Sequence, residues 1–346
     1  MAEVDRRQFL EALVALPMAT DWRGHSFINA SFKSYWAGRR GEMISRMELV
    51  MGPYPKAKRK PPLSVRTLES FDLPTITRTK ISYLSEGEDH VPAYLLIPKN
   101  LKRRVPGIIC PHPTTVLGGR EPAGLGGDPT KWYALELAER GYVTLAPDYP
   151  NPLSTQEFDG YCSDAYRHGY LSGTMKGIWN HMRGVDLLQS LPEVDPERIA
   201  CIGHSLGGHN SLFLADFDSR IRVVVSSCGF TSFAKYRGGD LSGWAQQLYM
   251  PLIAVKYHND PAEMPFGFSD VLAAIAPRPI FINAPIHDRN FDVSGVRDVM
   301  KLVRPIYERH FSAGNRLIVE YPDAPHSFSD NVRHKAYEFI DKWLNA

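Results

Sequence analysis

The segment Gly203-His204-Ser205-Leu206-Gly207 constrains this chain more than any other feature of its sequence. It follows the apolar run Ile199–Ile202 and precedes small and apolar residues that continue to Ala215. This pattern predicts a buried strand, a sharp turn and a helix, with the Ser205 hydroxyl exposed at the top of the turn. Glycines two positions before and after the serine remove side chains that would clash in so tight a bend. Placed between a strand and a helix, G-x-S-x-G indicates a serine nucleophile.

The composition is that of a globular chain without a strong net charge. Of 346 residues, 43% are hydrophobic, and 40 basic residues against 38 acidic ones leave a formal charge of +2. This balance gives no reason to expect nucleic acid or an anionic membrane as the main partner. No run of about 18 apolar residues occurs, so no membrane span is predicted. Nothing in the sequence indicates an oligomeric state.

The four cysteines are interpreted as free thiols and not as a disulfide framework. Three of them lie inside or just after apolar runs, which is typical of buried thiols. The chain contains no C-x-x-C pair and no H-E-x-x-H motif, so no metal site is indicated, and we expect no cofactor. The cysteines are Cys110, Cys162, Cys201 and Cys228.

The N-terminal segment has two interpretations. Asp5-Arg6-Arg7-Gln8-Phe9-Leu10 resembles a twin-arginine export signal, but the apolar stretch that follows is short, contains Glu11 and ends at Pro17. We expect a cytoplasmic protein, with export as the open alternative. The other interpretation is an amphipathic helix whose apolar face carries Phe9, Leu10, Leu13 and Leu16.

Residues 1–74 are predicted to form a helical extension and a linker, because they carry no strand pattern. Within them, Ser31–Met51 has aromatic and aliphatic residues at roughly helical spacing, which predicts a helical arm packed on the main domain. The short basic run Lys56–Lys60 lies among prolines and is interpreted as a solvated linker.

From Thr75 onward, strands alternate with helices, which predicts an α/β domain over residues 75–346. The alternation predicts a mostly parallel sheet with helices on both faces, made mixed at its first edge by a hairpin over residues 75–97. Further strands are expected at Gly107–Cys110, Tyr142–Ala146, Ile199–Ile202, Ile221–Val225, Pro279–Ala284 and Leu317–Tyr321. Helices are expected at Lys131–Arg140, Ser172–Leu191, Leu206–Phe217, Val293–Phe311 and Asn331–Leu344.

Two aromatic segments interrupt this alternation. The first covers residues 149–170, and the second covers about residues 229–271. Long inserts between strands of such a sheet usually lie over the site at the carboxyl ends of the strands. The second segment is therefore predicted to be a cap. Its aromatic residues form either its own small core or the lining of a pocket, and both alternatives stay open.

Serine needs a base, and the base needs an acceptor that holds its tautomer. On this fold the expected chain order is serine, acid, histidine, each just after a strand. Asp288 follows the strand that ends at Ala284, with Asp292 as the alternative acid. His326 follows the strand that ends at Tyr321 and precedes the last helix. Ser205, Asp288 and His326 are thus the predicted catalytic residues.

An oxyanion formed at Ser205 needs two hydrogen-bond donors. The N–H of Leu206 is expected to be one, at the N-terminus of the helix after the serine. The second is expected from the loop after Cys110, where Pro113 has no N–H and Thr114 is the main candidate. The weaker candidates are Thr115 and the ring of His112. The remaining polar residues near the serine, predicted to have supporting or structural roles, are His204, His209 and Asn210.

Over about residues 75–346 the chain resembles the α/β-hydrolase superfamily. Within it, the chain is similar to dienelactone hydrolases and acetyl xylan esterases, which are related to the catalytic domains of prolyl oligopeptidases. The resemblance implies the same three catalytic residues. Two departures are a serine where the best-known dienelactone hydrolases use cysteine, and His-Pro-Thr where many relatives have His-Gly-Gly. The residues that carry the resemblance are His112–Thr115, Ala146–Tyr149, Gly203–Gly208 and Pro285–Asp288.

The expected activity is that of a serine hydrolase of carboxylic esters that works through an acyl-enzyme. We expect the substrate to be a short-chain ester or another small ester, with carbohydrate-borne esters included, because the sequence shows no long apolar lid. A peptidase of the oligopeptidase type is one alternative. A noncatalytic binding protein on the same scaffold is the other.

Overall fold

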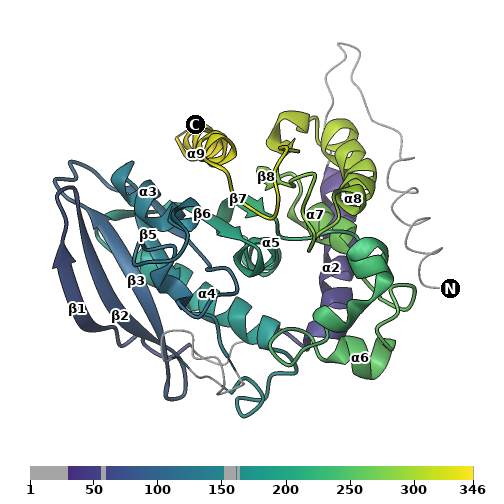
Figure 1. The fold of residues 1–346 in the computed structure, drawn as a ribbon, viewed down its shortest axis with the longest axis horizontal. Coiled ribbons are helices and arrows are strands. Elements are labelled where there is room, and N and C mark those ends of the chain that lie inside the picture. Colours follow the sequence, from purple (N-terminus) through teal and green to yellow (C-terminus); the bar gives the residue numbers. More distant parts are fainter. Residues whose placement is uncertain (1–29, 56–59, 152–160, 162–163, 346) are drawn as a thin grey trace.

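The computed structural model describes residues 30–55, 60–151, 161 and 164–345 (Figure 1). The segment for which an export signal or an amphipathic helix is predicted lies outside these residues, as does Cys162. None of the described helices combines the length and the apolar character needed to cross a bilayer.

One sheet of nine strands runs through the described chain, in the order β1-β2-β3-β5-β4-β6-β7-β8-β9. The neighbours from β5 through β9 pair in parallel, whereas β1, β2, β3 and β5 pair antiparallel. This confirms the predicted mixed sheet with an antiparallel first edge. The strands are β1 Arg66–Asp72, β2 Ile76–Glu86, β3 Asp89–Pro98, β4 Val105–Ile109, β5 Val143–Pro147, β6 Val194–His204, β7 Ile221–Ser227, β8 Ile280–Asn283 and β9 Leu317–Glu320.

Helices cover both faces of the sheet (Figure 1). Successive residues of the central strands face opposite sides, so Cys201 packs with one apolar cluster while Ala200 and Ile202 pack with the other. Helices α3 and α9 contribute to the second cluster, and α4, α5 and α7 contribute to the first. The helices are α2 Ala30–Met51, α3 Tyr133–Glu139, α4 Gly173–Ser190, α5 Leu206–Phe217, α6 Leu252–Tyr257, α7 Phe268–Ile275, α8 Val293–Pro305 and α9 Asp330–Leu344.

The region before residue 75 differs from its prediction at one place. Helix α2 is present as expected, and its buried residues Trp36, Met43 and Met47 join the larger core. The same region also contains strand β1, Arg66–Asp72, which was expected to be linker. Every residue of β1 is exposed, because the strand adds only to the free edge of the hairpin. A strand of this kind shows no alternation of apolar and polar residues and leaves little trace in the sequence.

The predicted cap occupies the long connection between β7 and α7. It consists of two short 3₁₀ segments, Phe233–Gly239 and Leu241–Gly243, followed by helix α6. Its aromatic residues serve in both of the ways that the sequence left open. Phe233 packs on Phe266 within the core, and Tyr249 lines a pocket over the carboxyl ends of the strands.

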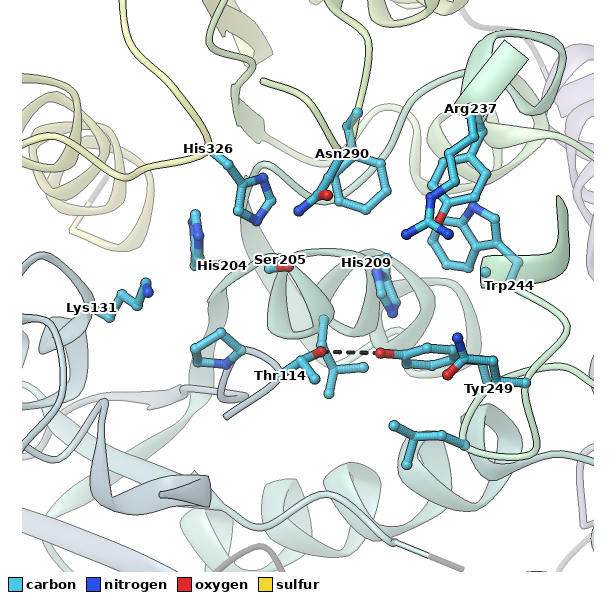
Figure 2. A pocket seen from close by; sticks show the side chains of 17 residues that line it. Thr114, Lys131, His204, Ser205, His209, Arg237, Trp244, Tyr249, Asn290 and His326 are labelled. Atoms are coloured by element: carbon cyan, nitrogen blue, oxygen red, sulfur yellow. Dashed lines mark hydrogen bonds between the residues drawn. The ribbon is translucent and has the colours of Figure 1, made fainter. Parts of the chain in front are cut away.

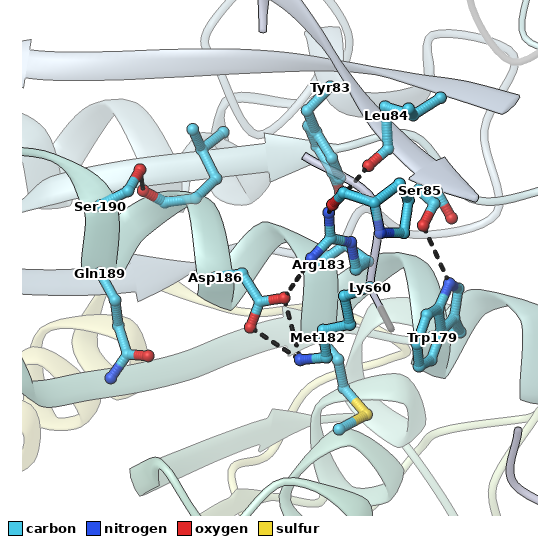
Figure 3. A network of polar contacts seen from close by, with 12 residues as sticks. Lys60, Tyr83, Leu84, Ser85, Trp179, Met182, Arg183, Asp186, Gln189 and Ser190 are labelled. Atoms are coloured by element: carbon cyan, nitrogen blue, oxygen red, sulfur yellow. Dashed lines mark hydrogen bonds and ion pairs between the residues drawn. The ribbon is translucent and has the colours of Figure 1, made fainter. Parts of the chain in front are cut away.

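A polar cluster around Asp186 ties two separate segments of the chain to helix α4 (Figure 3). The Asp186 carboxylate on α4 accepts hydrogen bonds from Lys60 Nζ at 2.9 Å and from Arg183 Nη1 at 2.5 Å. Arg220, just before β7, donates to the same carboxylate at 2.6 Å. Because Arg183 is only 3% exposed, its charge depends on this partner.

We predict that Asp186→Asn lowers the free energy of unfolding by roughly 2–3 kcal/mol, since it leaves three cations without their shared carboxylate. Chemical denaturation measures the loss. Asp298→Asn removes an exposed partner of Lys301 and serves as the control, for which we expect a change below about 0.5 kcal/mol. Equal effects of the two substitutions would contradict the structural role of the Asp186 cluster.

Candidate active site

Ser205 lies at a bend that only a particular set of neighbours permits. Its backbone has φ 55° and ψ −116°, between the end of β6 and the start of α5. A Cβ on Gly203 would lie 2.2 Å from the Gly207 carbonyl oxygen, and one on Gly207 would lie 2.1 Å from that of Pro111. The Ser205 N–H donates to the Ser227 carbonyl of the neighbouring strand at 2.8 Å. The two glycines and this bond hold the serine in a conformation that costs on the order of 1–3 kcal/mol.

The structure brings His326 and Asp288 together. His326 Nδ1 lies 2.8 Å from Asp288 Oδ2, and the Asp288 side chain is 1% exposed. The other oxygen of Asp288 accepts the backbone N–H groups of Asn290 at 2.8 Å and Phe291 at 3.0 Å. Asp292, the alternative acid, instead caps helix α8 by accepting from Ser294 N–H at 2.7 Å. Asp288 therefore has the geometry of a carboxylate that fixes a histidine ring.

The Ser205 and His326 side chains line the same pocket, and in Figure 2 the serine lies below the histidine ring. His204 packs against His326 with 4.8 Å between ring centroids, and its Nδ1 lies 2.9 Å from Ser227 Oγ. Burial is the main cause that holds the pKa of His204 well below its usual value, and the positive charge of Lys131 adds to the effect. His204 is thus a neutral ring that packs against His326 and lines the same pocket.

The loop that carries His326 is anchored by residues that the sequence analysis did not single out. Asn283 Nδ2, at the end of β8, lies 2.9 Å from the Ser327 carbonyl and 2.9 Å from Ser227 Oγ. The residue before the Asp288 turn is anchored too, since His287 N–H donates to the Ala324 carbonyl at 3.1 Å. The sequence did carry one signal for the role of Asn283, since it is a polar residue at the end of a buried strand.

Among the described residues, Cys228, Asp288 and His326 form a group whose ligand atoms lie within 4.8 Å of one another. Burial, with the nearby Asp288 charge, raises the pKa of the Cys228 thiol well above its usual value. A protonated thiol is a poor metal ligand, and the other two groups already bond to each other. The arrangement therefore fits a histidine–carboxylate pair better than a metal site.

The two predicted oxyanion donors, Leu206 and Thr114, line the same pocket as Ser205. Leu206 is the first residue of α5, so its N–H is among those that a helix leaves without an internal acceptor. Thr114 lines the pocket, and its hydroxyl lies 3.1 Å from the Tyr249 hydroxyl (Figure 2). The His112 ring is otherwise engaged, since its Nε2 accepts the Tyr149 N–H at 2.9 Å. Burial lowers the pKa of His112 to about 4, so the ring is neutral.

The pocket has a volume of about 460 Å³ and lies between the strand ends and the cap. Aromatic side chains of the cap form one wall, and His209 packs against it, with its ring centroid 4.8 Å from that of Trp244. His209 was predicted to be structural. It is buried, but it also lines the pocket, because the first turn of α5 carries it under the cap.

Comparison with known proteins gives a consistent set of relatives. The family model described as "Glucuronyl esterase, fungi" matches residues 155–310. The Bacillus subtilis (strain 168) protein named "Putative hydrolase YtaP" is 28% identical over 322 residues, which span 88% of this chain and 100% of that protein. A glucuronoyl esterase from Solibacter usitatus superposes with a TM-score of 0.72 and 17% identity, covering 94% of this chain and 97% of its own. Acetyl Xylan Esterase 1 from Thermoanaerobacterium sp. JW/SL YS485 superposes with a TM-score of 0.57 and 17% identity, covering 97% and 99%.

The chain has the α/β-hydrolase fold. The resemblance that the sequence indicated is confirmed at the level of the fold, with acetyl xylan esterases among the structural neighbours of this chain. The comparisons also agree with the predicted enzyme class, a hydrolase of carboxylic esters. The roles of individual residues rest on the geometry described above.

Asp288→Asn should reduce kcat by roughly 10²–10⁴-fold, because an amide presents its N–H to His326 and favours the wrong tautomer. Steady-state hydrolysis of a 4-nitrophenyl ester measures the effect, and thermal unfolding verifies that the variant folds. Asp292→Asn is the matched control and should change kcat less than about twofold. A larger loss in Asp292→Asn than in Asp288→Asn would show that Asp292 is the functional acid.

Proposed function

We propose that this protein is a serine hydrolase that cleaves carboxylic esters through an acyl-enzyme. The observation that carries the proposal is the 2.8 Å pairing of His326 with the buried Asp288 in the pocket that also exposes Ser205. A serine on a strained turn, next to an imidazole held by a carboxylate, is the arrangement that nucleophilic catalysis at neutral pH requires.

In this mechanism, His326 takes the proton from Ser205 Oγ as that oxygen attacks the ester carbonyl. The tetrahedral intermediate collapses when His326 returns the proton to the leaving alcohol, which leaves an acyl group on Ser205. A water molecule, activated by the same ring, then attacks the acyl carbon and releases the acid. Asp288 holds the Nδ1 proton of His326 throughout and stabilises the imidazolium.

The oxyanion of each intermediate is stabilised at the start of helix α5. The Leu206 N–H is the first donor in this proposal, and the helix dipole adds to its effect. Thr114 supplies the second donor, through its backbone N–H or its hydroxyl. His112 is excluded as a donor because its Nε2 already accepts the Tyr149 N–H.

A carbohydrate-borne ester is the substrate class that the pocket supports best. Tyr236, Trp244 and Tyr249 line one wall, and aromatic faces of this kind pack well against the apolar faces of sugar rings. The neighbours named glucuronoyl esterase and acetyl xylan esterase support the same class. The pocket is partly open to solvent, which suits a substrate attached to a larger saccharide.

Ser205→Ala should reduce hydrolysis of 4-nitrophenyl acetate by roughly 10³-fold or more while the protein stays folded, since no other group takes over the attack. Ser70→Ala, on the exposed strand β1, is the control and should retain full activity. Unchanged hydrolysis in Ser205→Ala would overturn the proposal.

A substrate panel then separates the esterase from the peptidase alternative. It contains acetylated xylo-oligosaccharides, methyl esters of uronic acids, 4-nitrophenyl esters of increasing chain length and a prolyl 4-nitroanilide. We expect the highest kcat/KM with the carbohydrate-borne esters. Faster cleavage of the anilide would favour the oligopeptidase alternative.

A further inference from the structure

The pocket above Ser205 is lined by two cations and by no acidic residue among the described ones. Lys131 and Arg237 both contribute to its wall, and none of the described residues that line it carries a carboxylate. Asp288 lies behind His326, with its side chain only 1% exposed. In Figure 2 the two cations stand on opposite sides of Ser205, with Lys131 toward the α3 end and Arg237 on the cap.

Arg237 lies in an unusual stretch of backbone. It has φ 46°, and the next two residues, Gly238 and Gly239, have φ 70° and 99°. A non-glycine residue in this region is uncommon, and strained residues of this kind gather at ligand-binding segments. The Arg237 guanidinium lies 5.3 Å above the Tyr236 ring, which in turn packs on Trp244 at 5.7 Å. The cation therefore belongs to the same wall as the aromatic residues.

The acidic residues near these cations are engaged elsewhere or lie at longer range. The charge of Arg237 contributes to lowering the pKa of Asp240. The Asp240 oxygens, however, accept hydrogen bonds from the Ser242 N–H and the Ser242 hydroxyl, each at 2.8 Å. Lys131 Nζ lies 3.6 Å from Asp128 Oδ2, so the charge of Lys131 is partly balanced. Within the part of the chain that the structure describes, no carboxylate oxygen lies within 4 Å of the Arg237 guanidinium. Arg237 is thus the cation best placed to receive an anion from outside.

We propose that Arg237, with Lys131 in a weaker role, forms a subsite for a free carboxylate on the ester substrate. The proposal rests on the proposed esterase function and narrows its substrate to an acidic, carbohydrate-borne ester. A planar guanidinium matches a carboxylate with two parallel hydrogen bonds, which an ammonium cannot reproduce. The neighbouring aromatic rings would pack against the ring that carries the carboxylate.

We expect this subsite to change which ester the protein prefers, and not the chemical step at Ser205. Arg237 is exposed, so its attraction for an anion is weakened by water and by salt. We expect kcat/KM to be higher for an anionic ester than for a neutral ester of the same length. The preference should fall as ionic strength rises from about 20 mM to about 500 mM, because the Debye length shortens.

The test compares kcat/KM for two pairs of esters, one with the anion on the acyl side and one with it on the alcohol side. The first pair is mono-4-nitrophenyl adipate and 4-nitrophenyl hexanoate. The second is 4-acetoxybenzoate and methyl 4-acetoxybenzoate. In at least one pair, Arg237→Gln should lower the ratio of anionic to neutral kcat/KM by about tenfold relative to the natural protein, whereas Arg237→Lys should retain part of the preference.

Lys235→Gln is the matched control, because it removes one positive charge from an exposed residue of the same cap segment that does not line the pocket. Its ratios should stay within twofold of the natural protein. Ratios in Arg237→Gln within twofold of the natural protein in both pairs, or an equal loss in Lys235→Gln, would overturn the subsite while leaving the esterase intact. Failure of the natural protein to cleave any of the four esters would instead count against the proposed esterase function.

Discussion

The bend at Ser205 is the constraint on which the rest of the site depends. The positive φ of this residue raises its side chain above the sheet, and it is possible because Gly203 and Gly207 leave room for the Gly207 and Pro111 carbonyls. The bond from Ser205 N–H to the Ser227 carbonyl fastens the bend to the adjacent strand. Helix α5 begins directly after it, so the proposed oxyanion donor, the Leu206 N–H, comes from the same turn that exposes the hydroxyl.

The remaining parts of the site come from other connections at the same edge of the sheet. Parallel strands β6, β7, β8 and β9 are neighbours, and each ends beside the next. Asp288 follows β8 and His326 follows β9. Because these two strands are neighbours, the two side chains lie next to each other. Asn283 and Ser227 bond to each other beneath them and hold the histidine loop through the Ser327 carbonyl. The cap then closes one side with aromatic residues and Arg237.

Much of this arrangement was predictable, because the signals were local. The elbow, the strand–helix alternation and the placement of an acid and a histidine after successive strands all follow from short stretches of sequence. Strand β1 was not predictable, since an exposed edge strand shows no alternation. The packing of His204 on His326 and the pocket position of Arg237 also escaped, because each depends on how distant segments meet. The choice between a self-packed cap and a pocket wall could not be made from composition, and the structure shows both uses.

The most direct test of the central claim is covalent labelling by a fluorophosphonate. The account predicts one phosphonyl group per chain, located on Ser205 by peptide mapping, with complete loss of ester hydrolysis as the label accumulates. His326→Ala should slow the labelling greatly, since the ring makes the serine hydroxyl reactive. Labelling at another residue, or full ester hydrolysis in a protein whose Ser205 is quantitatively modified, would contradict the account.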